Sequence, residues 1–201
     1  SMSVPSDKHL LRQSALEHRR QLSSRTVVTA GRAIHEHLWQ WSGWGTAKRI
    51  HTYVDALPGE VPTRELIAHA LSTDRQVVIP VVGTDRTLRH HLLTDLDDLR
   101  PGPMKLWQPH TPCWVDDLSD LDVILVPATV FDLRGHRIGM GGGYYDRLLA
   151  DLPAATQRVG LIYDAWLHER VPSQAHDQPV DLIITECSSY PVTDHIATES
   201  S

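Results

Sequence analysis

The longest apolar stretch of the chain covers residues 123–131, nine positions that include Pro127. It is much shorter than the roughly 20 residues that a helix needs to cross a bilayer. A near-continuous apolar segment of this length is typical of a strand buried on both faces, as strands of parallel sheets are. We therefore predict a buried strand over residues 122–132, in a sheet that helices must cover on both sides.

Strand and helix signals alternate through most of the chain. Helices are expected over residues 8–22, from Ser23 or Ser24 to a break at residues 42–45, and over residues 63–71 and 144–152. Asp7 and one of the two serines are the expected N-caps of the first two helices. Further strands are expected over residues 49–55, 76–82, 87–93, 158–163 and 181–185. This order predicts an α/β fold with a largely parallel twisted sheet flanked by helices, in a single domain over residues 1–201.

Three segments lie outside this pattern. Residues 94–122 are rich in proline and carry seven aspartates against one arginine and one lysine, a charge of −5, so an irregular excursion is expected there. Residues 1–6 and 191–201 are expected to be loose ends. Ser1 ahead of Met2 is typical of a residue left by cloning.

The charge balance limits the classes of ligand. The 201 residues carry 19 Lys and Arg against 25 Asp and Glu, a net charge of −6, whereas nucleic-acid binding needs a basic surface. A small polyanion needs only a few cations and stays open. Two cysteines 74 positions apart form neither a disulfide framework nor a thiolate zinc site. Without a secretory signal or a membrane segment in the sequence, we expect a cytoplasmic protein.

Histidine is unusually frequent, with 13 residues in the chain. Neighbouring pairs such as His90 and His91 lack the spacing to cysteines or carboxylates that zinc sites show. We expect packing or surface roles for the histidines. His176, beside Asp177, is kept as a candidate for a supporting role at a site.

A glycine-rich segment follows the predicted buried strand directly. It holds five glycines between Asp132 and Tyr144, together with Arg134 and Arg137, and it leads into a predicted helix. Ligands of open α/β sheets bind beyond the carboxyl ends of the strands. Glycines let backbone N–H groups approach an anion, and a helix N-terminus adds partial positive charge. The segment predicts an anion site, and the alternative is a flexible hairpin or glycines needed only for packing.

Standard phosphate-loop patterns do not describe this segment. No lysine follows the glycines, and Tyr144 stands where the dinucleotide-binding pattern has its last glycine. Asp146 falls in the first turn of the predicted helix, where a carboxylate complements the helix dipole. A structural charge is therefore one interpretation of Asp146. The other is a Mg²⁺ ligand, since Mg²⁺ prefers one or two carboxylates together with phosphate oxygens.

The segment from Phe131 to Arg147, FDLRGHRIGMGGGYYDR, resembles the signature of the 5-formyltetrahydrofolate cyclo-ligases, also called methenyltetrahydrofolate synthetases. Weaker blocks follow in the family's order: Lys8 with Arg12, residues 53–63 with Leu-Pro-Gly-Glu-Val, and residues 171–186 with His-Asp. The resemblance covers residues 8–186. It implies a Rossmann-like fold similar to the NagB/RpiA/CoA-transferase scaffold.

The resemblance also implies a reaction of folate one-carbon metabolism. ATP and Mg²⁺ would be used to cyclise 5-formyltetrahydrofolate to 5,10-methenyltetrahydrofolate through a phosphorylated formyl group, with release of ADP and phosphate. A formamide oxygen is a poor leaving group, which is why phosphorylation helps. Catalysis of this phosphoryl transfer rests mainly on positioning and charge neutralisation.

Site residues follow from the resemblance position by position. The nucleotide would contact Lys8, Arg12, Arg134, Gly135, His136, Arg137, Ile138, Gly139, Met140, Gly141 and Gly142. The folate would contact Tyr53, Glu60, Met140, Gly141, Gly142, Gly143 and Tyr144. Asp146 would bind Mg²⁺ with Asp177 as a second ligand, and Arg137, Tyr144 and Asp146 would be the catalytic residues.

Without the resemblance, several of these residues have simpler interpretations. Lys8 and Arg12 suit a solvated basic helix, and Glu60 suits an exposed turn. Tyr53, Tyr144 and Tyr145 could border a pterin, but they also suit the core. The functional interpretation of Glu60 is that a carboxylate can accept paired N–H bonds from the amino-pyrimidine edge of a pterin.

Two departures from the family bear on function. Gln108 stands where the family usually has a glutamate, and Met140 stands where many members have a basic or aromatic residue. They favour the alternative of a non-catalytic folate- or nucleotide-binding module on the same scaffold. A sugar-phosphate isomerase would explain the anion loop but not Asp146. The expected partners are a folate, also in polyglutamylated form, with no nucleic acid and no membrane, and we expect a monomer.

Overall fold

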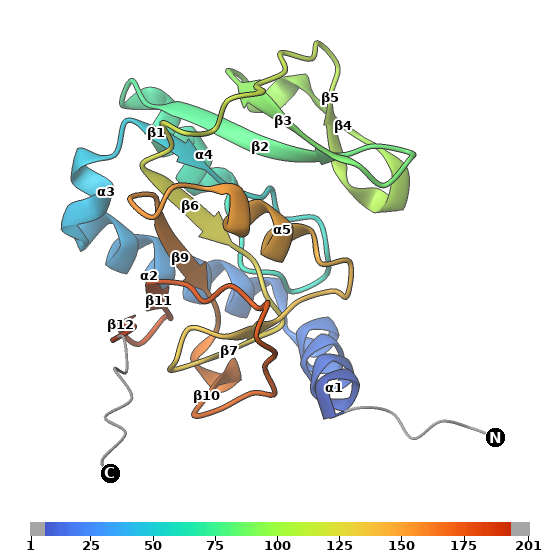
Figure 1. Ribbon diagram of the computed structural model, residues 1–201, viewed down its shortest axis with the longest axis vertical. Helices are drawn as coiled ribbons and strands as arrows, with labels where there is room; N and C mark the ends of the chain where they lie inside the picture. The colour runs from blue at the N-terminus through green and yellow to red at the C-terminus, as the bar shows by residue number, and fades with distance from the viewer. Residues whose placement is uncertain (1–6, 194–201) are drawn as a thin grey trace.

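The computed structural model describes residues 7–193, which are built around a large sheet (Figure 1). Its strand order is β12-β11-β9-β6-β1-β2-β3. The strands are β1 (Arg49–His51), β2 (Gln76–Val82), β3 (Leu88–Leu93), β6 (Val123–Val126), β9 (Gln157–Leu161), β11 (Leu182–Ile184) and β12 (Ser189–Pro191). The five inner strands are parallel, and the edge strands β3 and β12 run antiparallel to their neighbours. The predicted α/β fold with a largely parallel sheet is confirmed.

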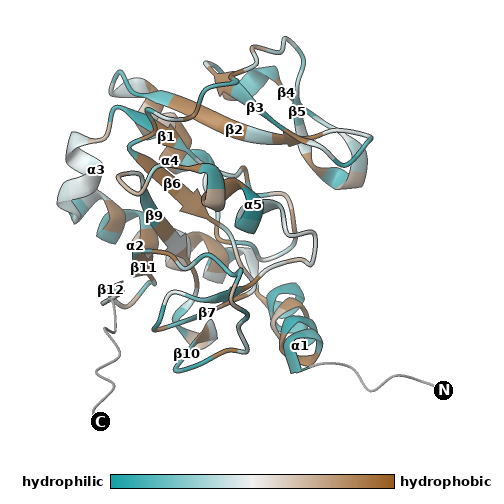
Figure 2. Cartoon of the chain, in the orientation of Figure 1, coloured by the Kyte–Doolittle hydropathy of each residue, from teal (hydrophilic) through white to brown (hydrophobic). Residues whose placement is uncertain are grey.

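Helices cover both faces of the sheet, so its central strands are buried on two sides. On one face, α2 (Ser24–Gln40), α3 (Ser42–Thr46) and α4 (Arg64–Ser72) form a core with alternate strand residues such as Val77 and Val123. On the other face, α5 (Tyr144–Asp151) packs on the residues between them, such as Val78 and Ile124. Figure 2 shows the resulting contrast between the hydrophobic central strands and the hydrophilic α1 (Asp7–Gln21).

The predicted strand over residues 122–132 is in fact two strands of two different sheets. β6 ends at Val126, and β7 (Val130–Asp132) lies in a small sheet of order β10-β7-β8, with β8 at Arg137–Ile138 and β10 at Leu167–His168. Pro127 at the junction has no N–H to donate to a ladder, and β7 pairs with β8 instead. Every residue of β6 and β7 is buried, as the apolar run predicted.

Other elements differ from the predictions in extent. β1 ends at His51 rather than near residue 55, and the expected break at residues 42–45 forms the short α3. The segment 94–122 is less irregular than expected, since it holds η1 (Leu96–Asp98), β4 (Leu99–Pro101), η2 (Pro103–Lys105) and β5 (Trp107–Pro109), with β4 and β5 paired.

The first two helices begin within one residue of their predicted N-caps. Ser23 caps α2, because its hydroxyl accepts a hydrogen bond from the Thr26 N–H at 3.1 Å. Asp7 is the first residue of α1 rather than a residue before it. Pro191 belongs to β12, while the other expected loose ends, residues 1–6 and 194–201, lie outside the described residues. Between residues 7 and 193, no helix is long and apolar enough to cross a membrane.

Candidate functional site

The predicted site residues gather beyond the carboxyl ends of the parallel strands. Tyr53 follows β1 by two residues, the chain passes from β6 into the β7–β8 hairpin, and Tyr163 follows β9. α1 packs against β7 and β8 beside this edge. The position is the one at which open α/β sheets bind their ligands.

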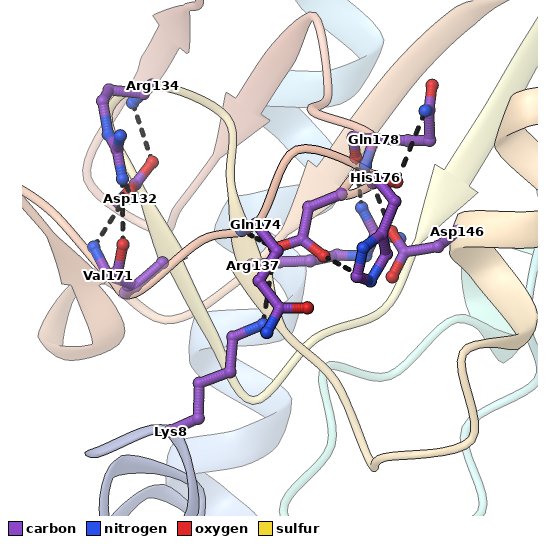
Figure 3. A network of polar contacts seen from close by, with 10 residues as sticks. Lys8, Asp132, Arg134, Arg137, Asp146, Val171, Gln174, His176 and Gln178 are labelled. Carbon is purple, nitrogen blue, oxygen red and sulfur yellow. Dashed lines mark hydrogen bonds and ion pairs between the residues drawn. The ribbon is translucent and has the colours of Figure 1, made fainter. Parts of the chain in front are cut away.

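Asp132 organises the hairpin between β7 and β8. Its fully buried carboxylate accepts hydrogen bonds from the backbone N–H groups of Arg134 (2.9 Å), His136 (3.0 Å) and Val171 (2.9 Å). The Arg134 guanidinium donates to Asp132 Oδ2 at 2.8 Å and to the Val171 carbonyl at 2.9 Å. These donors compensate the burial of the carboxylate. Arg134 is engaged inside the hairpin, and Figure 3 shows it apart from Arg137 and Lys8.

The glycines after β8 form an exposed loop that ends at α5. Gly141 and Gly143 have φ angles of 101° and 66°, a conformation that glycine adopts without the steric penalty of a Cβ. Gly143 is the N-cap of α5, and no side chain caps that helix. The N–H groups of its first turn therefore present their partial positive charge at the loop. Met140 lies in the same loop with 56% of its surface exposed.

α1 turns a row of cations toward this loop. Lys8, Arg12, Ala15 and Arg19 follow one another at spacings of four, three and four residues, which places them on one helical face. Arg12 Nε donates to the Gly139 carbonyl at 2.6 Å. Lys8 and Arg12 are both partly buried, so a solvated basic face does not describe this side of the helix.

Arg137 and Asp146 form an ion pair between the hairpin and α5 (Figure 3). Arg137 Nη2 lies 2.8 Å from Asp146 Oδ1, and only 7% of the Arg137 side chain is exposed. Arg137 Nη1 donates to the Gln178 carbonyl at 2.5 Å, and the Gln178 N–H donates to Asp146 Oδ1 at 3.2 Å. Burial lowers the pKa of Arg137, and the charge of Asp146 opposes that shift.

Asp177 approaches the same region from the segment after β10. Its carboxylate accepts hydrogen bonds from the Gln174 N–H at 2.7 Å and from Lys8 Nζ at 3.4 Å, and His176 Nε2 lies 3.5 Å from it. Burial opposes ionisation of Asp177, but the Gln174 N–H and the Lys8 charge outweigh it and lower the pKa of this carboxyl. His176 therefore lies beside a predicted site residue, as its sequence position suggested.

Glu60 lies in the turn that follows β1. Its carboxylate accepts hydrogen bonds from the N–H groups of Ala56 (3.0 Å) and Leu57 (3.3 Å). Burial raises the pKa of Glu60, although those hydrogen bonds and the charge of Arg19 lower it. Tyr163 donates to the Glu60 carbonyl at 3.4 Å, and burial raises the pKa of Tyr163 to about 12. Glu60 therefore does not lie in an exposed turn. It is partly buried and hydrogen-bonded to the backbone of its own turn.

Two other predicted residues turn their side chains away from the surface. Tyr53 is 5% exposed and its hydroxyl donates to the Val61 carbonyl at 3.1 Å, a core position. Ile138 is 1% exposed and packs in a small cluster with Ala15, so it offers a ligand only its backbone. Tyr144, in contrast, is partly exposed at the start of α5, with the Arg147 guanidinium 5.2 Å from its ring centre.

The cations and carboxylates thus converge without forming a metal cage of their own. Over residues 7–193, no three side chains of His, Cys, Asp or Glu come together in a way that could hold a metal ion. What the edge offers is a set of positive groups around an open loop, with the Asp146 carboxylate 30% exposed beside them. Such a surface suits a polyphosphate, with or without a metal ion bound to it.

Residues 4–186 match the model of the 5-formyltetrahydrofolate cyclo-ligase family. The chain belongs to this family. The 5-formyltetrahydrofolate cyclo-ligase of Haemophilus influenzae is 30% identical over 174 residues, which cover 83% of this chain and 91% of the relative. The Escherichia coli K12 cyclo-ligase is 31% identical over 172 residues, with 77% and 93% covered. Membership of the cyclo-ligase family makes the chain an enzyme of the ligase class.

Solved structures of cyclo-ligases support the same assignment. The structure of Aquifex aeolicus 5,10-methenyltetrahydrofolate synthetase matches with a TM-score of 0.81 and 29% identity over 93% of both chains. The synthetase from Mycoplasma pneumoniae matches with a TM-score of 0.72 and 22% identity over 90% of this chain and 99% of that one, which shows the shared fold.

Within this cyclo-ligase, the Gln108 side chain lies at the carboxyl end of β2. Its amide Nε2 donates to the Val82 carbonyl at 3.1 Å, which ties β5 to the end of β2. The side chain thus has a structural partner at the edge of the main sheet.

Sequence reasoning missed three residues of this cyclo-ligase site. Arg19 is 4% exposed, its Nη2 donates to the Ala128 carbonyl at 2.5 Å, and its charge acts on Glu60. The spacing of Lys8, Arg12 and Arg19 was the signal that could have found it. Asp132 was quoted in the family signature without a role, and Tyr163, which donates to the Glu60 carbonyl, was predicted only as the end of a strand.

Proposed function

We propose that this cyclo-ligase converts 5-formyltetrahydrofolate to 5,10-methenyltetrahydrofolate with consumption of ATP. The observation that carries the proposal is the convergence of Lys8, Arg12 and Arg137, from two distant parts of the chain, around the glycine loop and the uncapped start of α5. Three cations and a helix N-terminus around a glycine-rich loop suit a triphosphate. The family membership supplies the folate substrate.

The proposed chemistry begins with the formyl oxygen. Its lone pair attacks the γ-phosphorus of ATP, ADP departs, and the formyl carbon becomes an iminium carbon that carries a phosphate ester. N10 then attacks this carbon and loses its proton, and the carbon–oxygen bond breaks to release phosphate. Lys8, Arg12 and Arg137 would neutralise charge on the phosphates during the first step, where positioning and charge account for most of the catalysis.

Mg²⁺ fits this site as an ion that arrives with the nucleotide. Asp146 uses Oδ1 for Arg137 and the Gln178 N–H, so Oδ2 is the oxygen that would bind the ion, together with phosphate oxygens. Asp177 would be a second ligand only after Lys8 turns from it to a phosphate. Mg²⁺ would supply shielding of phosphate charge.

Glu60 is proposed to hold the pterin. When no ligand is bound, its carboxylate closes the turn at Ala56 and Leu57. The amino-pyrimidine edge of a folate would offer it stronger, paired N–H donors. If N–H groups of the folate replace the backbone N–H groups, the Glu60 carboxylate has hydrogen-bond donors both with and without the ligand.

The direct test follows the methenyl product by its near-ultraviolet absorbance after the protein is mixed with ATP, Mg²⁺ and 5-formyltetrahydrofolate. We expect product only when all three are present, and none after chelation of the metal with EDTA. Titration calorimetry runs in parallel with folate alone and nucleotide alone. Tight folate binding by a folded protein that forms no product would contradict the proposal and favour a non-catalytic binding module.

Four further properties stay predictions. They are a single domain, a monomer, a cytoplasmic location, and the use of polyglutamylated folates. The exposed Met140 beside the glycine loop is a residue at which a basic side chain would strengthen contact with a glutamate tail.

A further inference from the structure

The hydroxyl of Tyr145 has no hydrogen-bond partner among residues 7–193. Tyr145 is the second residue of α5, and its ring packs against the core beneath that helix. Its Oη is shielded from solvent, and no described residue lies within hydrogen-bond distance of it. Buried hydroxyls almost always have a partner, so this one needs an explanation.

The position of the hydroxyl links the two halves of the proposed site. Tyr145 directly precedes Asp146, whose carboxylate pairs with Arg137 at 2.8 Å, and the charges of both Glu60 and Arg137 act on the Tyr145 hydroxyl. Glu60 is the residue proposed for the pterin, and Arg137 is one proposed for the phosphates. In the reaction, the atoms that lie between the pterin and the transferred phosphate are those of the formyl group on N5.

Leaving such a hydroxyl unpaired is unfavourable for the folded protein. A phenylalanine would fill the same space without the cost of a buried polar group that lacks a partner. A ligand that reaches the hydroxyl would supply the missing partner. The exposed glycine loop directly precedes Tyr145 along the chain.

We propose that Tyr145 is a catalytic residue of this reaction, whose hydroxyl donates a hydrogen bond to the oxygen that starts as the formyl oxygen and leaves with the phosphate. The proposal rests on the proposed function. As the carbon–oxygen bond breaks, that oxygen takes the bonding electron pair and gains negative charge, so a donor aimed at it stabilises the departure. A nitrogen lone pair, shared between N5 and N10, forms the carbon–nitrogen double bond of the methenyl bridge in its place.

The hydroxyl acts as a donor and keeps its own proton. A hydrogen bond needs no transfer of the Tyr145 proton, and the cations around the site would neutralise the released phosphate.

The test compares Tyr145→Phe with wild type in a rapid-quench experiment that measures ADP and the methenyl product separately. A matched control is Tyr190→Phe, since Tyr190 lies on β12 and its hydroxyl has a hydrogen-bond partner, Asp164 Oδ1 at 3.1 Å. For Tyr145→Phe we expect ADP to form at close to the wild-type rate and the methenyl product to form about 100-fold more slowly. The KM values for ATP and folate should stay within about twofold.

Thermal unfolding supplies a readout that separates catalysis from structure. Loss of an unpartnered hydroxyl should leave the Tm of Tyr145→Phe unchanged or raise it by about 2–4 °C, whereas Tyr190→Phe should lower its Tm by a similar amount at unchanged rates. Methenyl formation by Tyr145→Phe within about threefold of wild type, equal slowing of ADP and methenyl formation, or a lowered Tm would each overturn the assignment. A wild-type protein that forms no product would instead overturn the proposed function.

Discussion

Arg137 and Asp146 depend on each other in the unliganded protein. Arg137 is almost fully buried, and Asp146 Oδ1 at 2.8 Å is its charged partner. Asp146→Asn should therefore have two effects: kcat falls by about 100-fold or more, because the proposed metal ligand loses its charge, and the free energy of unfolding falls by about 2 kcal/mol, because a buried arginine loses its counter-ion. Steady-state kinetics at several Mg²⁺ concentrations and urea unfolding measure the two effects.

Asp151→Asn is the control for this prediction. Asp151 is the last residue of the same helix and is exposed, so its neutralisation should change neither quantity measurably. A turnover of Asp146→Asn that returns to the wild-type value at saturating Mg²⁺ would contradict the metal role. Loss of stability without loss of turnover would reduce Asp146 to a structural partner of Arg137.

At the level of elements, α1 is unusual because its inward face is charged. Its only buried residues are Ala15 and Arg19, and Lys8 and Arg12 continue the same stripe toward the loop. Lys8→Ala should raise the KM for ATP by about tenfold, the contribution of one charge-assisted hydrogen bond. The KM for folate and the Tm should hardly change, because the partly exposed Lys8–Asp177 pair contributes little to stability.

The matched control on α1 is Arg20→Ala. Arg20 lies on the outer face of the helix and pairs with Glu17 at 3.1 Å, with more than half of each side chain exposed. Kinetics at varied ATP should therefore not distinguish this variant from wild type. Equal increases of both KM values in Lys8→Ala would indicate a general structural role for Lys8 instead of contact with phosphates.

Most elements were predictable because their signals are local, whereas partners across the chain were not. The Ser23 cap and the helical spacing of apolar residues predicted α2, and runs of apolar residues predicted the central strands. The division of residues 122–132 between two sheets depends on the pairing of β7 with β8, which an apolar pattern on either side of Pro127 does not encode. Strand propensity reports burial rather than the identity of the neighbouring strand.

In the candidate site, too, residues within sequence motifs could be predicted, whereas contacts between distant parts of the chain could not. The family resemblance predicted Lys8, Arg12, Arg137, Asp146 and Asp177, and the structure brings them together. Arg19 was missed because an arginine on a basic helix usually faces water. No sequence pattern predicts that the Tyr145 hydroxyl lacks a hydrogen-bond partner among the described residues. That lack depends on which polar groups the whole fold places near the hydroxyl.

For the whole molecule, buried histidines predict a pH-dependent stability. Burial lowers the pKa of His35, His51, His90 and His91 below the ordinary 6.5. Below pH 6.5 the unfolded chain therefore binds more protons than the folded one, so stability falls as the pH falls. Each histidine that stays neutral contributes up to about 1.4 kcal/mol per pH unit. Urea unfolding at pH 7.0 and 5.5 should show a loss of at least about 1 kcal/mol.

Other titrating groups do not reverse this sign. The raised pKa of Glu60 acts in the opposite direction above pH 4.5, but it is one group against four. The lowered pKa values of Asp85, Asp117 and Asp177 matter only below about pH 3.8. His51→Gln should flatten the pH dependence, and the exposed His110→Gln should leave it unchanged. Equal stability of the wild-type protein at both pH values would contradict the prediction.

The division of the chain after β6 affects how the site can adapt. Glu60 and Tyr163 are attached to the large sheet, whereas Arg134 and Arg137 belong to the β7–β8 hairpin of the small sheet. Over residues 7–193 no strand pairing joins the two sheets, although the Val180 N–H before β11 donates to the Gly135 carbonyl of the hairpin at 2.9 Å, and residues 127–129 lead directly from one sheet to the other. A small rotation of one sheet against the other would change the width of the gap between the pterin and phosphate groups while every strand pairing stays intact.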